Sequence, residues 1–387
     1  MRVLVLNAGS STLKASVLEV DPAGPRRATP PLDSTTVSWG SDASRTTGRN
    51  DHLRRVLDRF AAAGIQPSAL AAVGHRVVHG GERFTEATLI DGATLTQLDD
   101  LATLAPLHNP VALDTIRAAR MLLPSVPHVA AFDTAFHATL PHHARTYPIP
   151  QAWRAALGIR RFGFHGLSVD WSVGRAAELL ERPADELRLV VAHLGSGCSV
   201  TAVDRTASVD TSMGFTPLEG LMMGTRSGSI DPGIPLHLER EGLADAATIT
   251  DALEHGSGLL GVSGVSGEMR LVREAAAAGD PRASLAIELF VRSAARAIAA
   301  ATTSLDQLDA LVFTGGIGEH DAATRAAVVG RLAPLGVLPL PDRPADDDGD
   351  TCISAARAMP AVLRVVARED VVIAHQALRA VAPSAWR

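Results

Sequence analysis

A strand, a turn rich in glycine and serine and a second strand open the chain, and this pattern returns near the middle. The first copy runs from Val3 to Val17 and turns at Ala8 to Thr12. The second copy runs from Leu189 to Val203, with Gly195 in the place of Gly9. The copies lie about half a chain apart, whereas solenoid repeats recur every ~20–50 residues. The pattern therefore predicts a duplicated domain.

Further predicted strands alternate with helices along the rest of the chain. The strands are Val126 to Phe132, Leu311 to Thr314 and Ala361 to Val366; the helices include His52 to Ala63, Ala283 to Ala301 and Val371 to Ala380. Such alternation is typical of α/β layers. The segment from Gly256 to Gly267 is too rich in glycine for a regular element, so a hinge or an interface loop is expected there.

Composition narrows the class of protein. The 387 residues leave room for two domains, and 46% hydrophobic with 20% charged residues is typical of a soluble globular protein. A net charge of -6 without a basic stripe argues against a nucleic-acid surface. No stretch resembles a signal peptide or a membrane span, which predicts a cytoplasmic protein with no membrane partner. Cys198 and Cys352 suit reduced thiols.

The first turn has the chemistry of a phosphate cradle. Glycine allows backbone N–H groups to approach a ligand closely, and the hydroxyl groups add donors. Lys14 is the only lysine among 36 basic residues. Either it survived by chance, or the position needs a compact ammonium group. Ordinary turns also use these residues, but the second turn and the corner Gly315, Gly316 and Gly318 favour a nucleotide. No Walker sequence is present.

Three basic residues lie on glycine-rich corners. Arg76 belongs to Gly74–Gly81, Arg226 to Gly224–Gly228 and His165 to Phe162–Gly166. Each alone is more often a structural residue. Together they suit phosphoryl transfer, in which the protein positions reactants and neutralises charge on the transferred group. Zinc-type ligand spacing and a nucleophile elbow are both missing from the sequence.

Acidic residues end one predicted strand and begin the last helix. Asp133 lies at the carboxyl end of its strand, where α/β sheets bind ligands, and its carboxylate could hold Mg²⁺. A helix N-cap is an equal alternative. Glu369 and Asp370 open the last helix, where the dipole favours acids in any protein, so a structural role is favoured from these residues alone.

An ordered set of six motifs resembles the acetate kinase family along essentially the whole chain. The motifs are Asn7-Ala-Gly-Ser-Ser with Lys14, Gly74-His-Arg-Val-Val-His-Gly-Gly, Phe132-Asp-Thr-Ala-Phe-His, Phe162-Gly-Phe-His-Gly, Pro217-Leu-Glu-Gly-Leu-Met-Met-Gly-Thr-Arg-Ser-Gly and Gly315-Gly-Ile-Gly-Glu. The resemblance implies reversible, in-line phosphorylation of acetate to acetyl phosphate by ATP, assisted by Mg²⁺ or Mn²⁺.

The resemblance also implies a fold. It is an α/β fold of two duplicated, actin-like ATPase (ribonuclease H-like) domains flanking a nucleotide cleft, as in sugar kinases and Hsp70. The first domain would cover residues 1–135, completed by the C-terminal helix 370–387. The second would cover residues 136–369, bind the nucleotide and form a homodimer.

Site residues follow from the same resemblance. The catalytic residues would be Arg76, Asp133, His165 and Arg226. The carboxylate substrate would contact Arg76, Val78, Leu107, His108, Phe164 and Pro217. The nucleotide (ATP or ADP) would contact Ser10, Ser11, Lys14, His193, Gly195, Ser196, Gly197, Gly315, Gly316, Ile317, Gly318 and His320. The metal would be held by Asn7 and Glu369, together with Asp133.

The chain departs from the usual family pattern at four positions. Ser196 and His320 stand where asparagine is usual, Val169 replaces a histidine and Ser229 replaces an aspartate. Two other functions remain open. One is a kinase of propionate or another short-chain carboxylate, since one methylene changes binding by only about 1–3 kcal/mol. The other is a non-catalytic, Hsp70-like nucleotide-binding regulator, which would not need the acyl-side arginines.

Overall fold

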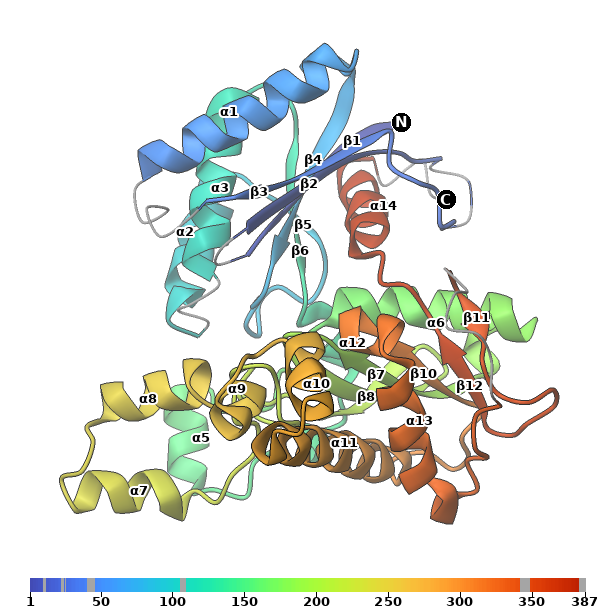
Figure 1. Cartoon of the computed structure of the whole chain (residues 1–387). Helices are drawn as coiled ribbons and strands as arrows, with labels where there is room; N and C mark the ends of the chain where they lie inside the picture. Colours follow the sequence, from blue (N-terminus) through green and yellow to red (C-terminus); the bar gives the residue numbers. More distant parts are fainter. Residues whose placement is uncertain are drawn as a thin grey trace. The chain divides into compact units, whose positions relative to one another are not determined.

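The computed structural model describes residues 1–9, 12–21, 24, 26–39, 46–104, 109–341 and 349–382. Contacts divide the chain into two compact units (Figure 1). The first unit comprises Met1–Ala138, Phe164–Trp171 and Arg368–Arg387, and the second comprises Thr139–Gly163 and Ser172–Ala367. Each unit contains a six-stranded mixed sheet with helices, so the α/β class predicted from the sequence is confirmed.

The two sheets share one topology, strand for strand. The first has the order β3-β2-β1-β4-β6-β5 and the second the order β9-β8-β7-β10-β12-β11. In each sheet, three parallel strands lie in the middle. Two antiparallel strands extend the sheet on one side, and a two-residue antiparallel strand forms the edge on the other side. The strands of the first sheet are β1 (Arg2–Ala8), β2 (Thr12–Glu19), β3 (Asp33–Ser38), β4 (Leu70–Val77), β5 (Thr88–Leu89) and β6 (His128–Phe132). Those of the second are β7 (Arg188–Leu194), β8 (Cys198–Asp204), β9 (Ala207–Thr211), β10 (Ala310–Thr314), β11 (Thr351–Cys352) and β12 (Ala361–Arg364). The predicted duplication is confirmed.

The two glycine-serine turns occupy equivalent places in the sheets. Gly9 follows β1 directly, and Gly195 follows β7 directly. Each glycine amide donates back across its own turn, from Gly9 to the Thr12 carbonyl at 2.8 Å and from Gly195 to the Gly197 carbonyl at 3.1 Å. In the hairpins, Asn7 pairs with Lys14 and His193 pairs with Ser199. The sequence alignment therefore holds for β1, β7 and the two glycines, whereas the pairing of the return strands differs by one residue.

Helices cover both faces of the first sheet (Figure 1). One face carries α1 (Thr46–Ala62), α2 (Gly92–Asp100) and α3 (Asn109–Leu122), and Leu53, Phe60 and Leu4 belong to the buried core between α1 and the sheet. The opposite face carries α14 (Glu369–Val381), from the far end of the chain. Gly74 lets α14 approach closely, because a Cβ there would lie 2.6 Å from the Ile373 side chain. Short 3-10 helices η2 (Pro67–Ala69), η3 (Leu101–Leu104) and η4 (Ala135–Thr139) connect these elements.

The second sheet packs on the long helix α11 (Pro281–Thr302), which contacts β7 and β8. The helices α9 (Gly258–Ser263), α10 (Met269–Ala277) and α13 (Ala322–Arg331) pack on α11. The remaining elements are α4 (His142–Arg145), α5 (Gln151–Leu157), α6 (Gly166–Leu180), α7 (Gly233–Arg240), α8 (Ala246–His255), α12 (Gly315–His320), η5 (Ala184–Glu186) and η6 (Ala333–Leu335). The first turns of α6 belong to the first unit.

One prediction about local structure was wrong. The glycine-rich segment Gly256–Gly267 contains the helix α9, where no regular element was expected. Tertiary contacts stabilise it, since the amides of Leu259 and Leu260 donate to the carbonyls of Met223 and Gly224 at 2.9 and 3.0 Å. Leu259 is fully buried. Within the described ranges, no helix has the length and apolar character to cross a membrane.

Candidate active site

The carboxyl ends of three strands bring four predicted site residues together in the first unit. Asn7 lies near the end of β1, Arg76 lies near the end of β4, and Asp133 follows β6. The fourth residue, Glu369, is the first residue of α14. Because β1, β4 and β6 are parallel, their carboxyl ends share one edge of the sheet, the edge at which α/β sheets bind ligands.

Arg76 is the centre of this cluster. Its Nε and Nη2 donate to the two carboxylate oxygens of Asp133 at 2.8 and 2.5 Å, which is a bidentate pair. Its Nη1 donates to Oδ1 of Asn7 at 3.3 Å, and its Nε lies 3.6 Å from Oε2 of Glu369. The Nδ2 of Asn7 donates to the same Glu369 oxygen at 3.2 Å. Asp133 is therefore an ion-pair partner whose carboxylate is buried.

The charges of the cluster depend on one another. Burial alone would lower the pKa of Arg76, but the carboxylates of Asp133 and Glu369 raise it, so the guanidinium stays charged. Burial raises the pKa of Glu369, and the nearby Asp133 carboxylate raises it further, while Arg76 and Lys14 oppose this. Lys14 itself is exposed. The buried Asp133 carboxylate and the partly exposed Glu369 carboxylate thus share one guanidinium, and a further cation would stabilise both.

The donor atoms of this cluster fit Mg²⁺. Two carboxylates and the amide oxygen of Asn7 are the hard oxygen ligands that this ion prefers, and Mg²⁺ usually keeps several waters and substrate phosphate oxygens. Among the described residues, no group of three or more His, Cys, Asp or Glu side chains could hold a metal by itself. The arrangement therefore suits an ion that arrives with a nucleotide better than a permanently bound one.

The predicted acyl-side residues are divided between the units. Val78 follows β4 and is buried, and Phe164 is also buried in the first unit. His165 has a left-handed backbone, with φ of 57°. Pro217 belongs to the second unit. Leu107 and His108, like Ser10 and Ser11 of the first turn, lie outside the described residues.

The predicted nucleotide residues of the second unit lie together around the second turn. A Cβ on Gly195 would lie 3.7 Å from the backbone nitrogen of Gly316, and one on Gly315 would lie 3.1 Å from Nε2 of His193. Gly197 completes this turn, and Ser196 is exposed. Residues 315 to 318, including Ile317 and Gly318, form the first turn of α12, where a loop was expected; the side chain of His320 at its end is 75% exposed.

The loop that carries Arg226 is joined to this turn, since the Gly224 amide donates to the Ser196 carbonyl at 3.1 Å. Nη1 of Arg226 donates to the Pro217 carbonyl at 3.3 Å. Burial lowers the pKa of the Arg226 guanidinium, and Glu254 partly offsets this effect. The structure thus places Arg226 beside Pro217 and connects both to the nucleotide-type turn.

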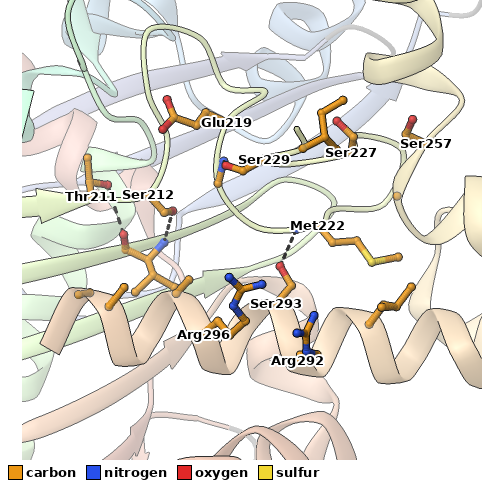
Figure 2. A pocket seen from close by; sticks show the side chains of 18 of the residues that line it. Thr211, Ser212, Glu219, Met222, Ser227, Ser229, Ser257, Arg292, Ser293 and Arg296 are labelled. Atoms are coloured by element: carbon orange, nitrogen blue, oxygen red, sulfur yellow. Dashed lines mark hydrogen bonds between the residues drawn. The ribbon is translucent and has the colours of Figure 1, made fainter. Parts of the chain in front are cut away.

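The second unit contains a cavity of about 800 Å³, lined in part by the same loop. Figure 2 shows side chains that line it. The Met222 amide donates to the Ser293 hydroxyl of α11 at 2.9 Å, which anchors the loop on the helix (Figure 2). Arg292 and Arg296, one helical turn apart on α11, also line the cavity. None of the predicted site residues that the structure describes lines this cavity.

A polar network beside Pro217 was missed from the sequence. The Tyr147 hydroxyl bonds the Glu219 carboxylate and accepts from the Phe215 amide at 2.9 Å. Arg161 donates to Glu219 at 2.7 Å and to the Met213 carbonyl at 3.1 Å. Tyr147 is the only tyrosine of the chain, which could have marked it as a candidate site residue. Its partners lie far away in the sequence, so the network itself could not be predicted.

Comparison with known proteins points to one family. The model of the acetokinase family matches residues 2–375. A protein named acetate kinase from Synechococcus sp. (strain JA-2-3B'a(2-13)) is 45% identical, over 97% of this chain and 98% of the relative. Another with the same name, from Leifsonia xyli subsp. xyli, is also 45% identical, over 98% of this chain and 99% of the relative.

Solved structures give the same picture for the fold. The crystal structure of Porphyromonas gingivalis acetate kinase has a TM-score of 0.86 and 32% identity, covering 98% of this chain and 99% of that one. The crystal structure of a propionate kinase from Francisella tularensis subsp. tularensis SCHU S4 has a TM-score of 0.85 and 35% identity, covering 97% of this chain and 98% of that one.

Proposed function

Since this chain belongs to the acetate kinase family, we propose that it transfers the γ-phosphoryl group of ATP to acetate, giving acetyl phosphate and ADP in a reversible, in-line reaction. The observation that carries the proposal is the hydrogen-bonded cluster of Arg76, Asp133, Asn7 and Glu369, found in a chain that the family model matches almost from end to end. A regulator that only binds nucleotide would not need the acyl-side arginine Arg76.

The arginines supply the charge that phosphoryl transfer requires. In the proposed roles, Arg76 and Arg226 bind the carboxylate of the substrate and the transferred phosphoryl group. Arg76 uses Nε and Nη2 for Asp133, and its Nη1 makes only the longer bond to Asn7. The carboxylate of the substrate would therefore bind Nη1, because only the longer bond to Asn7 would be lost. His165 would donate to the charge that develops in the transition state.

A small apolar pocket would select the acid. Val78, Phe164 and Pro217, with Leu107, would surround the methyl group of acetate, and His108 would lie near the carboxylate. A pocket of this kind discriminates weakly between acids that differ by one methylene. One solved relative is named a propionate kinase, so propionate is the second candidate substrate.

Asn7, Asp133 and Glu369 would hold Mg²⁺, or Mn²⁺, directly or through water. When bound, the ion would neutralise phosphate charge and orient the phosphate oxygens of ATP. The cluster itself would keep the carboxylates of Asp133 and Glu369 ionised at the edge of the sheet, and it would hold the guanidinium of Arg76 in one orientation. Burial, and to a smaller extent the Asp133 carboxylate, raise the pKa of Glu369, and a cation bound beside it would oppose both effects.

The nucleotide would be bound mainly by the second domain, residues 136–369. His193, the turn Gly195–Gly197 with Ser196, the corner Gly315–Gly318 and His320 would contact it. Ser10, Ser11 and Lys14 would contact phosphate from the first domain, residues 1–135 with the helix 370–387. The grouping of the second turn, the corner and the Arg226 loop within one unit supports this assignment.

We further place the protein in the cytoplasm as a homodimer that associates through its second domain. Large apolar side chains are exposed on the helices α5 and α7 and just beyond α7. They are Trp153, Leu157, Ile234, Leu236 and Leu243. Several large exposed apolar side chains on one unit can mark a protein–protein interface.

An acid panel tests the function directly. Purified protein is incubated with Mg-ATP and acetate, propionate or butyrate, and hydroxylamine traps the acyl phosphate. We expect acetyl hydroxamate as the fastest product. Product from propionate at a higher kcat/KM would assign the second candidate substrate. ATP binding without acyl phosphate from any acid would overturn the proposal and favour a nucleotide-binding regulator.

A further inference from the structure

The starting point is the strained backbone at His165. Its φ of 57° lies in the left-handed region, which costs a residue with a side chain on the order of 1 kcal/mol or more. Such a conformation persists only where neighbouring groups hold it. The question is therefore which groups hold His165.

Two hydrogen bonds flank this residue. On one side, Nε2 of His137 lies 2.9 Å from the carbonyl oxygen of Phe164. On the other side, the Gly166 amide donates to the Asp133 carbonyl, also at 2.9 Å. Both partners come from the short segment Asp133–His137, which follows β6. One segment thus holds the residue before and the residue after His165.

The chemistry of His137 suits this role. A carbonyl oxygen only accepts, so Nε2 of His137 must carry the proton. The imidazole is fully buried, and burial lowers its pKa to about 4, so it is a neutral donor at neutral pH. Its own backbone is fixed as well, since its amide donates to the Thr134 carbonyl at 3.1 Å.

The two segments are also in direct contact. A Cβ on Gly166 would lie 2.2 Å from the Asp133 carbonyl oxygen and 2.8 Å from Cβ of Phe136. No side chain fits between them. The main chain of Asp133, whose carboxylate holds Arg76, is therefore packed against the turn that carries Phe164 and His165.

We propose that His137 is a positioning residue for phosphoryl transfer, which holds Phe164 and the left-handed His165 in register with the Asp133–Arg76 pair through its bond to the Phe164 carbonyl. This inference rests on the proposed function. His137 contacts neither reactant in this account and acts only through the main chain of the turn.

The test compares three substitutions at His137. In His137→Leu the Phe164 carbonyl loses its donor, and we expect kcat for acetate to fall about 10- to 100-fold, with KM for ATP unchanged within about twofold. In His137→Gln the side-chain amide reaches the position of Nε2 and should restore most of kcat. In His137→Asn the amide is too short to reach, so its kcat should resemble that of His137→Leu.

His128 offers a matched control in the same unit. It is also buried, and its Nε2 lies 3.1 Å from the Leu123 carbonyl, at the other end of β6. We expect His128→Leu to lower the melting temperature and leave kcat within about twofold of wild type. Gln and Asn variants that fold and share the same kcat would overturn the inference, even if His137→Leu does not fold. So would equal losses of kcat in His137→Leu and His128→Leu. Wild-type protein that forms no acyl phosphate would overturn the proposed function instead.

Discussion

Arg226 and Arg76 show how the surroundings of a residue decide its chemistry. Arg76 is paired with Asp133 and lies near Glu369, so it serves as a fixed part of a charge cluster. Nη1 of Arg226 donates to the Pro217 carbonyl and to the sulfur of Met223, and burial lowers the pKa of the guanidinium. A guanidinium with weaker compensation gains more from an arriving anion. We therefore expect a bound anion, such as the transferred phosphoryl group, to be stabilised more by Arg226 than by Arg76.

Replacement of Arg226 tests this at the residue scale. We expect Arg226→Ala to lower kcat about a thousandfold, since the missing charge stabilisation is worth about 4 kcal/mol in the transition state. Arg226→Lys should recover only part of the loss, because an ammonium group lacks the planar fork. Steady-state kinetics with acetate measure both.

The exposed Arg270 provides the control for Arg226. It pairs with Glu274 one helical turn away on α10, and such surface pairs contribute little. Arg270→Ala should keep kcat within about twofold of wild type. Similar kinetics for Arg226→Ala and Arg270→Ala, with both proteins folded, would contradict the role of Arg226.

At the scale of elements, the strands β4 and β6 bury a histidine pair inside the first sheet. Nε2 of His75 lies 3.0 Å from Nδ1 of His128, and burial lowers the pKa of both. Burial also lowers the pKa of His137 and His375 to about 4 each. All four imidazoles are therefore neutral in the folded protein and gain protons on unfolding at acidic pH.

This burial predicts acid sensitivity. A lowered folded-state pKa contributes stability that is complete above the unfolded value of about 6.5 and is lost as the pH falls toward 4. Each histidine that is protonated in the unfolded chain and neutral in the folded protein lowers the free energy of unfolding by about 1.4 kcal/mol per pH unit. Urea unfolding between about pH 7.5 and 5.5 measures the slope. Replacing His75 and His128 together by leucine should make it shallower, and an unchanged slope would contradict this account.

The secondary-structure elements also show which parts of the fold could not be predicted from the sequence. The turns after β1 and β7 could be predicted, because a local pattern of glycine and serine determines them. The helix α9 could not, since its amides are fixed by carbonyls of Met223 and Gly224, far away in sequence. Likewise, the bond from His137 to Phe164 joins two motifs that are separate in the sequence, and no spacing rule predicts it.

At the scale of the whole molecule, duplication explains why so much could be predicted. Each sheet repeats the same strand order, so its parallel strands end at one edge. Residues at the ends of β1, β4 and β6 must then meet, as Asn7, Arg76 and Asp133 do. Glu369 joins them because α14 returns to the first sheet, a contact that the family resemblance implied and residue patterns alone did not.

The proposed homodimer predicts that charged substitutions on its interface separate the two subunits. Leu236 on α7 and Leu243 beyond it are 64% and 68% exposed in the 40.4-kDa chain, and a subunit interface would bury them. We expect wild-type protein to have twice the chain mass in light scattering after size exclusion. The double variant Leu236→Glu/Leu243→Glu should shift it toward the mass of one chain, because two charges per subunit would be desolvated at the contact. Met121→Glu is the matched control, since Met121 is 62% exposed but lies in the first unit. A dimer that survives the double variant, or is lost in Met121→Glu alone, would place the interface elsewhere.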